Sequence, residues 1–296
     1  LRPQSLADRA LLQQAVTQLL CRYVDRFYQA RREQWDEQTM VYRPLDKNDP
    51  NLALRPQGVI EGRAGYVVKV KRSEQQLVKA VEALLQEQSR LYAQENDTLP
   101  RINFDRHLYQ PLLVDIPDKD KVQMVPAGLK ESEERFVSDL RDYWNKEKDR
   151  ALAVKELFLL RNLSRGYGIG FFEERRFYPD FILWLVDQQT RGQRIIFVEP
   201  HGMLHAKAYI HDEKARLWER LPALAAEIGK RSGHQDISLD AFIISATPFE
   251  ELRKRYDDGN WDRAKFAEHH ILFREPDHEY DYLTILLNLQ PIKVSD

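Results

Sequence analysis

The sequence has little cysteine, with Cys21 as the single thiol among 296 residues. One thiol cannot form an intramolecular disulfide, and it excludes a zinc site built from several cysteines. Disulfides are rare in reducing compartments, so we expect a cytoplasmic protein. The sequence also lacks any run of about 18 apolar residues, the length that a membrane-spanning helix needs. We therefore expect no contact with a membrane.

An excess of charge of one sign is also missing. Lys and Arg number 45, Asp and Glu number 47, and the formal net charge is −2. Bulk electrostatics therefore do not predict a nucleic-acid-binding protein, and any such binding requires a local basic surface. The sequence contains no Walker A motif, which predicts that the chain has no ATP-driven motor of its own. It begins with LRPQS and not with Met, so we expect a part of a longer polypeptide.

What is present is the balance of a globular protein, with 43% apolar and 31% charged residues. Apolar residues at three- and four-residue steps predict a long helix over about residues 5–37. YVVKVKR reads as a half-buried strand, and a helix with Leu77 and Val81 on its apolar stripe follows. The segment DIPDKDKVQMVPAGLK combines two prolines, a glycine and clustered charges, which predicts a domain boundary. We therefore expect a helical or α+β connecting domain over residues 1–125 and a second domain over 126–296.

The second domain alternates helices and strands. ESEERFVSDLRDYW predicts a helix that turns Phe136, Leu140 and either Tyr143 or Trp144 inward. The apolar segments ELFLL, FILWLV, RIIFVE and DAFIIS read as strands, and DAFIIS is apolar on both faces, as in a central covered strand. A helix is expected over about residues 209–231. TPFEELRKRY has the pattern of a capping box with Thr247 as the N-cap residue.

Two apolar segments, FYPDFILWL and RIIFVEPHG, carry unexpected polar groups. Asp180 lies near the start of the first segment, and Glu199 and His201 lie near the end of the second. If the two segments form a hairpin with a loop at about 187–192, residue 186 opposes 193 and residue 180 opposes 199. Side chains alternate along a strand, so Glu199 and His201 share a face with Asp180. Cβ atoms of opposed residues are about 5 Å apart.

Two facing carboxylates repel each other unless a cation lies between them. Oxygen ligands are those that Mg²⁺ prefers, with Mn²⁺ as a substitute, and the Pro200 carbonyl is a possible further ligand. Such a cation activates water and stabilises the charge that develops on a phosphodiester under attack. His201 could orient that water or balance charge. The alternative for each carboxylate is an ordinary solvated strand end.

Pro-Asp followed nineteen residues after the Asp by Glu-x-(basic residue) resembles the PD-(D/E)XK nuclease superfamily. The longer blocks LLRNLSRGYGIGFFEERRFYPDFILWL and FVEPHG resemble the C-terminal nuclease region of type III restriction-enzyme helicase subunits and related DEAD/DEAH-helicase restriction proteins. This resemblance implies an α/β fold with a restriction-endonuclease-like core, in which helices flank a mixed central sheet in the order αβββαβ. It also implies a metal-dependent DNA endonuclease of a prokaryotic defence system. Its implied partners are DNA, an upstream helicase motor and a methyltransferase or other defence subunit.

The resemblance also assigns roles to residues. Asp180 and Glu199 become metal ligands, and the acid of the first core helix becomes Glu133, with Glu134 as the alternative. The family's lysine falls on His201, which is a departure from the pattern, because histidine has an unperturbed pKa near ~6.5 and is mostly neutral at pH 7. Three alternatives follow: His201 replaces the lysine, Lys155 or Lys207 replaces it, or activity is weak or lost.

Arginines near the two segments are candidates for contacts with the DNA backbone. The alternative is ordinary solvated charge. The candidates are Arg161, Arg165, Arg175, Arg176 and Arg194. Three functions therefore compete: an active endonuclease domain, a nuclease fold that only binds DNA or docks on a helicase complex, and an interaction domain whose long N-terminal helix docks on a motor or methyltransferase subunit.

Overall fold

The computed structural model describes residues 67–86, 99–102, 112–125, 127–162, 178–203, 216–233, 236–256, 259–275 and 280–287, together with part of the stretch 14–31. Contacts within the chain separate two units, Leu1–Pro44 and Leu45–Asp296. The described residues of the first unit are helical, in the region where the sequence predicts a long helix. The predicted boundary between residues 125 and 126 lies inside the second unit and stays a prediction.

Two small antiparallel sheets open the second unit. Strand β1 (Val67–Val70) pairs with β4 (Val122–Val125), and β2 (Arg101–Ile102) pairs with β3 (Leu112–Leu113). Helix α2 (Gln75–Gln86) follows β1, and its Ala80 is buried in one apolar cluster with Leu99 and Leu113. The strand predicted at YVVKVKR is therefore confirmed, and the segment that reads as a linker contains β4.

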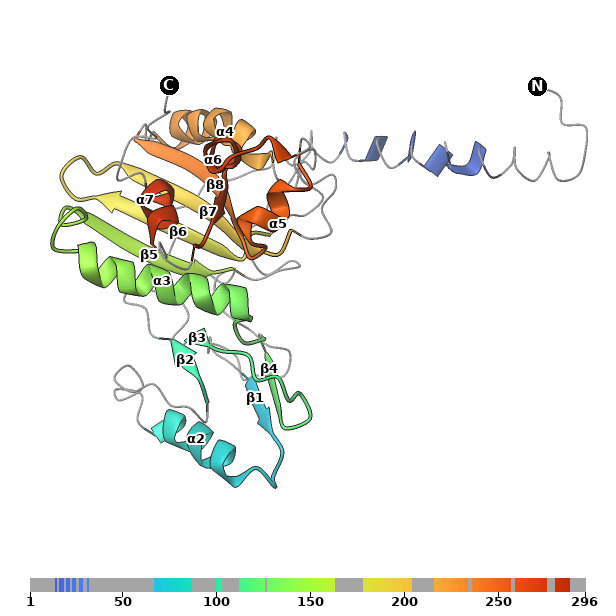
Figure 1. Ribbon diagram of the computed structural model, residues 1–296, viewed down its shortest axis with the longest axis vertical. Helices are drawn as coiled ribbons and strands as arrows, with labels where there is room; N and C mark the ends of the chain where they lie inside the picture. Colours follow the sequence, from blue (N-terminus) through green and yellow to red (C-terminus); the bar gives the residue numbers. More distant parts are fainter. Residues whose placement is uncertain are drawn as a thin grey trace, which may run out of the picture. The chain divides into compact units, whose positions relative to one another are not determined.

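The main sheet has five strands in the order β5-β6-β7-β8-β9 (Figure 1). Neighbours among the first three strands are antiparallel, whereas β8 is parallel to both β7 and β9. The prediction of a mixed sheet is confirmed, and β8, which contains DAFIIS, has a neighbour on each side as expected. The strands are β5 (Lys155–Arg161), β6 (Phe181–Asp187), β7 (Gln193–His201), β8 (Ile237–Ser245) and β9 (Ile271–Phe273).

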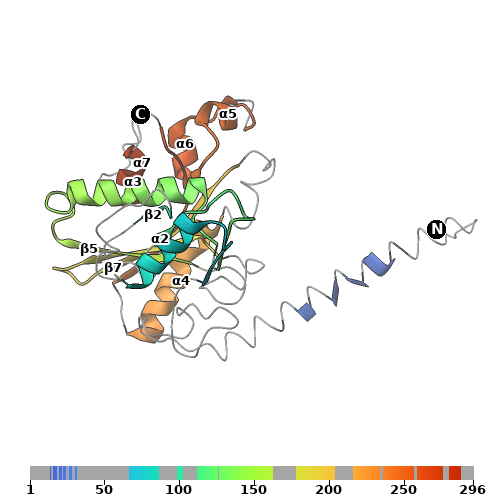
Figure 2. The same ribbon diagram turned by 90° about the horizontal axis from the view of Figure 1, so that it is seen from below.

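Helices cover both faces of this sheet. Figure 2 shows α3 (Glu131–Glu147) and α4 (Leu217–Ser232) on opposite sides of it. The order α3-β5-β6-β7-α4-β8 is the expected order of one helix, three strands, one helix and one strand. The short helices α5 (Phe249–Arg253), α6 (Arg263–Glu268) and α7 (Asp281–Leu286) complete the unit. None of the helices in the described ranges has both the length and the apolar character that crossing a bilayer requires.

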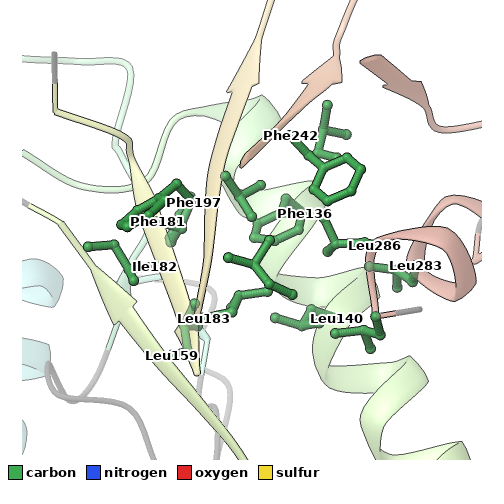
Figure 3. Close-up of a cluster of buried hydrophobic side chains, with 14 of the residues drawn as sticks. Phe136, Leu140, Leu159, Phe181, Ile182, Leu183, Phe197, Phe242, Leu283 and Leu286 are labelled. Atoms are coloured by element: carbon green, nitrogen blue, oxygen red, sulfur yellow. The ribbon is translucent and has the colours of Figure 1, made fainter. Parts of the chain in front are cut away.

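The core forms between α3 and the sheet. Phe136 and Leu140 of α3 are 1% and 0% exposed, and the ring of Phe136 lies 5.3 Å from that of Phe181 in β6. Figure 3 shows Phe136 and Leu140 in a cluster of buried side chains to which α7 contributes Leu283 and Leu286. The predicted inward face of α3 is confirmed. This helix therefore holds β6, and with it the chain around Asp180, in a fixed position.

One local prediction is wrong. Thr247 is not an N-cap, because α5 begins at Phe249 after Pro248, and the Thr247 hydroxyl accepts the backbone N–H of Met203 at 2.8 Å. The helix expected over about 209–231 is confirmed in the described part, where α4 runs from Leu217 to Ser232 with Pro222 inside it. Residues 204–215 lie outside the described residues.

Candidate functional site

The register of the β6–β7 hairpin is the predicted one. Val186 opposes Gln193 at the turn, and Phe181 opposes Val198 at the far end. Asp180 and Glu199 follow one residue beyond this last pair, and the backbone N–H of Asp180 donates to Glu199 Oε2 over 3.3 Å. Because the Glu199 carboxylate reaches the backbone of Asp180, the two acids lie beside each other where β6 begins.

The backbone around Asp180 is also bound to the end of β5. The N–H of Asn162 donates to the Asp180 carbonyl, and the side-chain amide of Asn162 donates to the Pro179 carbonyl, each over 2.8 Å. Asn162 is 8% exposed. The block LLRNLSRGYGIGFFEERRFYPDFILWL contains this residue, but the sequence analysis assigns it no role, although its place directly after a buried strand marks a polar group that needs partners.

His201 and Pro200 lie at the carboxyl end of β7. His201 is exposed, opposes Ser245 of the parallel strand β8, and accepts the N–H of Ala246 at its carbonyl over 3.0 Å. The Pro200 carbonyl accepts the Ser132 hydroxyl over 3.2 Å, which brings the beginning of α3 to the same edge of the sheet. Ligands of open α/β sheets bind at the carboxyl ends of parallel strands, so this edge is the favoured place for a site.

Glu133 lies on α3 near this edge, but its carboxylate forms a salt bridge with Arg161. It is 5% exposed, and its Oε2 atom lies 3.1 Å from Arg161 Nη2. The same oxygen accepts the backbone N–H of Lys130 over 3.4 Å, at the beginning of α3. Arg161 opposes Phe181, whose ring contacts α3. Glu133 therefore lies on the face of the sheet that α3 covers.

Val198 opposes Phe181 and therefore lies on the face that α3 covers. Because side chains alternate along a strand, the next residue, Glu199, projects from the opposite face of the sheet. Among the described residues, no group of three or more His, Cys, Asp or Glu side chains could hold a metal ion. The structure thus brings Asp180 and Glu199 together, with His201 two residues farther along β7, and does not join Glu133 to them in a metal-binding group.

The two carboxylates fit a magnesium ion that is bound by few protein groups. Mg²⁺ keeps several waters and commonly takes one or two protein carboxylates together with substrate phosphates. Asp180 and Glu199 supply that number, and the Pro200 carbonyl has a second lone pair beside the one that Ser132 uses. The donor set does not fit an ion that is fully enclosed by protein ligands.

The described arginines that were predicted to contact DNA have partners within the fold. Arg161 is 11% exposed and donates to the carbonyls of Ala127 and Gly128 as well as to Glu133. Arg194 is 17% exposed, and its guanidinium donates to Asp240 of β8 and to the Leu286 carbonyl, each over 2.6 Å.

Distance also separates Arg194 from the candidate site, because five residues of strand, or about 17 Å, lie between it and Glu199. Arg165, Arg175 and Arg176 lie outside the described residues.

Lys155 lies too far from Asp180 and Glu199 to take the place of the lysine in the PD-(D/E)XK pattern. It opposes Asp187, with which it forms a salt bridge, at the far end of β6. Seven residues of strand, or about 23 Å, separate that end from Asp180. The hydrogen bond from Lys155, followed by those from the N–H groups of Thr190 and Gln189, lowers the pKa of Asp187 below its usual range. Lys207 lies outside the described residues, so His201 and Lys207 remain as alternatives.

The chain matches no protein-family model, no curated protein and no solved structure.

Proposed function

We propose that this chain is a metal-dependent DNA endonuclease of the PD-(D/E)XK type, with a restriction-endonuclease-like core formed by α3, β5–β7, α4 and β8. The observation that carries the proposal is the register of β6 and β7 together with the hydrogen bond from the Asp180 N–H to Glu199, which makes the two acids neighbours where β6 begins. The element order and the mixed sheet support it. The sequence resemblance adds an upstream helicase motor, in a prokaryotic restriction or defence protein, as the proposed partner.

In this proposal Asp180 and Glu199 hold a magnesium ion, which supplies Lewis acidity for attack of water on a phosphodiester. Glu199 has a second task, because one of its oxygens also accepts the Asp180 N–H and so keeps the two acids together. His201 is exposed one strand step farther on, where it can bind a phosphate oxygen or hold a proton. Glu133 stays on the α3 face, where it compensates the charge of Arg161.

A second candidate function is a nuclease fold that binds DNA or docks on a helicase complex without cutting. It is favoured by the histidine in the place of the family's lysine and by two acids where the family pattern has three. In that case the acids would still bind a cation, but the chain would lack the constant positive charge that a lysine provides.

The test is nicking or cleavage of supercoiled plasmid with Mg²⁺ or Mn²⁺, and with a chelator. We expect Asp180→Ala and Glu199→Gln to reduce the rate at least about 100-fold, because each removes a charged ligand. Glu199→Gln keeps an oxygen that can accept the Asp180 N–H, so it separates loss of charge from loss of structure. Asp142→Ala and Glu227→Gln, at exposed sites on α3 and α4, are the matched controls.

Cleavage by Asp180→Ala at the rate of the original chain would refute the site. No cleavage by any form, together with Mn²⁺ binding that Glu199→Gln abolishes, would favour the second function. Neither cleavage nor Mn²⁺ binding would refute both.

A further inference from the structure

The end of β5 holds the chain on both sides of the Pro179–Asp180 peptide. Asn162 uses its backbone N–H for the Asp180 carbonyl and its side-chain amide for the Pro179 carbonyl, each over 2.8 Å. Both bonds join residues that are far apart in the sequence, so they fix the start of β6 relative to β5. Asn162 is only 8% exposed, which protects these bonds from competition with water.

The backbone polar groups around Asp180 have identified partners. The Pro179 carbonyl and the Asp180 carbonyl are bonded to Asn162, and the Asp180 N–H is bonded to Glu199. Pro179 also fixes its own φ angle, which removes one rotation from the chain that leads into Asp180. The Cα atom of Asp180, and with it the direction of its side chain, is therefore set by Asn162 on one strand and Glu199 on the other.

Arg161, the residue before Asn162, holds the chain at the start of α3 in a similar way. Its guanidinium binds Glu133 and the carbonyls of Ala127 and Gly128 at the approach to α3. Two successive residues at the end of β5 thus hold the start of α3 and the start of β6. The second of them contacts the candidate site.

We propose that Asn162 is a positioning residue, which holds the Asp180 backbone so that the Asp180 and Glu199 carboxylates face one cation. The proposal rests on the proposed function in one respect, namely that these carboxylates bind the metal. An amide is suited to the task because it donates to the Pro179 carbonyl without adding a third negative charge. Aspartate would turn a carboxylate toward that carbonyl, and alanine would leave the carbonyl without its side-chain donor.

The first test needs neither metal nor DNA. Exchange of the Asp180 amide proton with solvent is measured by NMR in the original chain and in Asn162→Ala. We expect exchange about tenfold faster in Asn162→Ala, because the Asp180 N–H bond to Glu199 depends on the position of this peptide. Asn145→Ala, the same change at an exposed position of α3, is the matched control and should leave the rate unchanged. An unchanged rate in folded Asn162→Ala would overturn the proposal.

The second test separates positioning from a general contribution to stability. The Mn²⁺ concentration that half-saturates the protein is measured by electron paramagnetic resonance. Loss of a group that orients a ligand typically weakens metal binding about 10- to 100-fold, and we expect a weakening in that range for Asn162→Ala. Equal half-saturation in Asn162→Ala and in the original chain would overturn the proposal, whatever the change in thermal stability.

The two tests also distinguish the proposal from the function on which it rests. An original chain that neither binds Mn²⁺ nor cuts DNA would refute the proposed function, whereas the exchange rates would still decide whether Asn162 holds Asp180. If Asn162→Ala does not fold, Asn162→Leu, which keeps about the same size but has no donor, takes its place with the same expected outcomes. In the original chain, the side-chain amide protons of Asn162 should exchange slowly, and rapid exchange would overturn the proposal without any variant.

Discussion

Arg161 binds Glu133 with an Nη2–Oε2 distance of 3.1 Å, and this pair joins the end of β5 to the beginning of α3. The two side chains are 11% and 6% exposed. The guanidinium also donates to the carbonyls of Ala127 and Gly128 over 2.6 and 3.0 Å, so most of its donors are used within the protein. Removing one partner of a buried pair leaves the other charge uncompensated, which is strongly destabilising.

Arg161→Ala should therefore lower the free energy of unfolding by about 3 kcal/mol, because it leaves the buried Glu133 carboxylate without its cation. Urea unfolding at pH 7 measures the change. Arg135→Ala is the matched control, since Arg135, whose side chain is 60% exposed, forms a salt bridge with Glu131 on the same helix. Exposed pairs contribute less than about 1 kcal/mol, so the control should be nearly neutral.

The alternative for Arg161 is the predicted contact with DNA, and the salt dependence of DNA binding distinguishes the two. Each phosphate contact contributes about 0.9 to the slope of log K against log salt concentration. A reduced slope in Arg161→Ala with unchanged stability would contradict the structural role.

The fold of the hairpin could be predicted because it depends on local features. A short polar turn joins two apolar strands, and the register follows from the turn alone, so the opposition of residues 180 and 199 could be derived from the sequence. The inward face of α3 followed in the same way from the helical period, with Phe136 and Leu140 at a four-residue step.

Other features depend on partners far away in the sequence. Thr247 has the spacing of an N-cap residue, but its hydroxyl accepts the N–H of Met203, 44 residues earlier. Arg194 opens the strand that carries Glu199, which favoured a place near the site, yet its guanidinium binds Asp240 and the Leu286 carbonyl. Tertiary contacts of this kind override a local pattern, and the sequence does not reveal them.

Substitutions of His201 test whether, in the proposed endonuclease, it takes the part of the lysine in the PD-(D/E)XK pattern. His201→Ala should lower plasmid cleavage about 100-fold, the usual cost of removing one group that stabilises the charge developing in the transition state. His201→Lys should keep the rate at pH 7 within about tenfold of the original, because lysine stays protonated well above pH 7. Cleavage rates at pH 6 to 9 measure both effects.

The pH profiles give the control within the same experiment. A histidine that acts as a cation is charged over a narrower pH range than a lysine, so the original chain should lose activity as pH rises from 6 to 9 while His201→Lys does not. Identical profiles and rates for all three forms would exclude a catalytic role for His201 and direct attention to Lys207.

Asp240 of β8 contacts two basic side chains, Arg194 of β7 and His270, which directly precedes β9. Its carboxylate lies 2.9 Å from Nδ1 of His270 and 2.6 Å from Nη2 of Arg194. The His270 ring is stacked between Trp218 and Phe242, at centroid distances of 4.4 and 4.6 Å. Burial alone would raise the pKa of Asp240, but the hydrogen bonds from His270 and Arg194 lower it below its usual value.

Asp240→Asn should therefore destabilise the protein in a pH-dependent way. A carboxyl group with a lowered pKa in the folded state stabilises that state above its unfolded pKa of about 3.9, and this contribution is lost as pH falls through the folded value. We expect a deficit of about 3 kcal/mol at pH 7 that narrows below about pH 4. Urea unfolding at pH 7, 5 and 3 measures it, with the exposed Asp236→Asn as the control. A deficit that is the same at every pH would mean that Asp240 acts through its shape and neutral hydrogen bonds, because only the charged form interacts more strongly with Arg194 in the folded state than in the unfolded one.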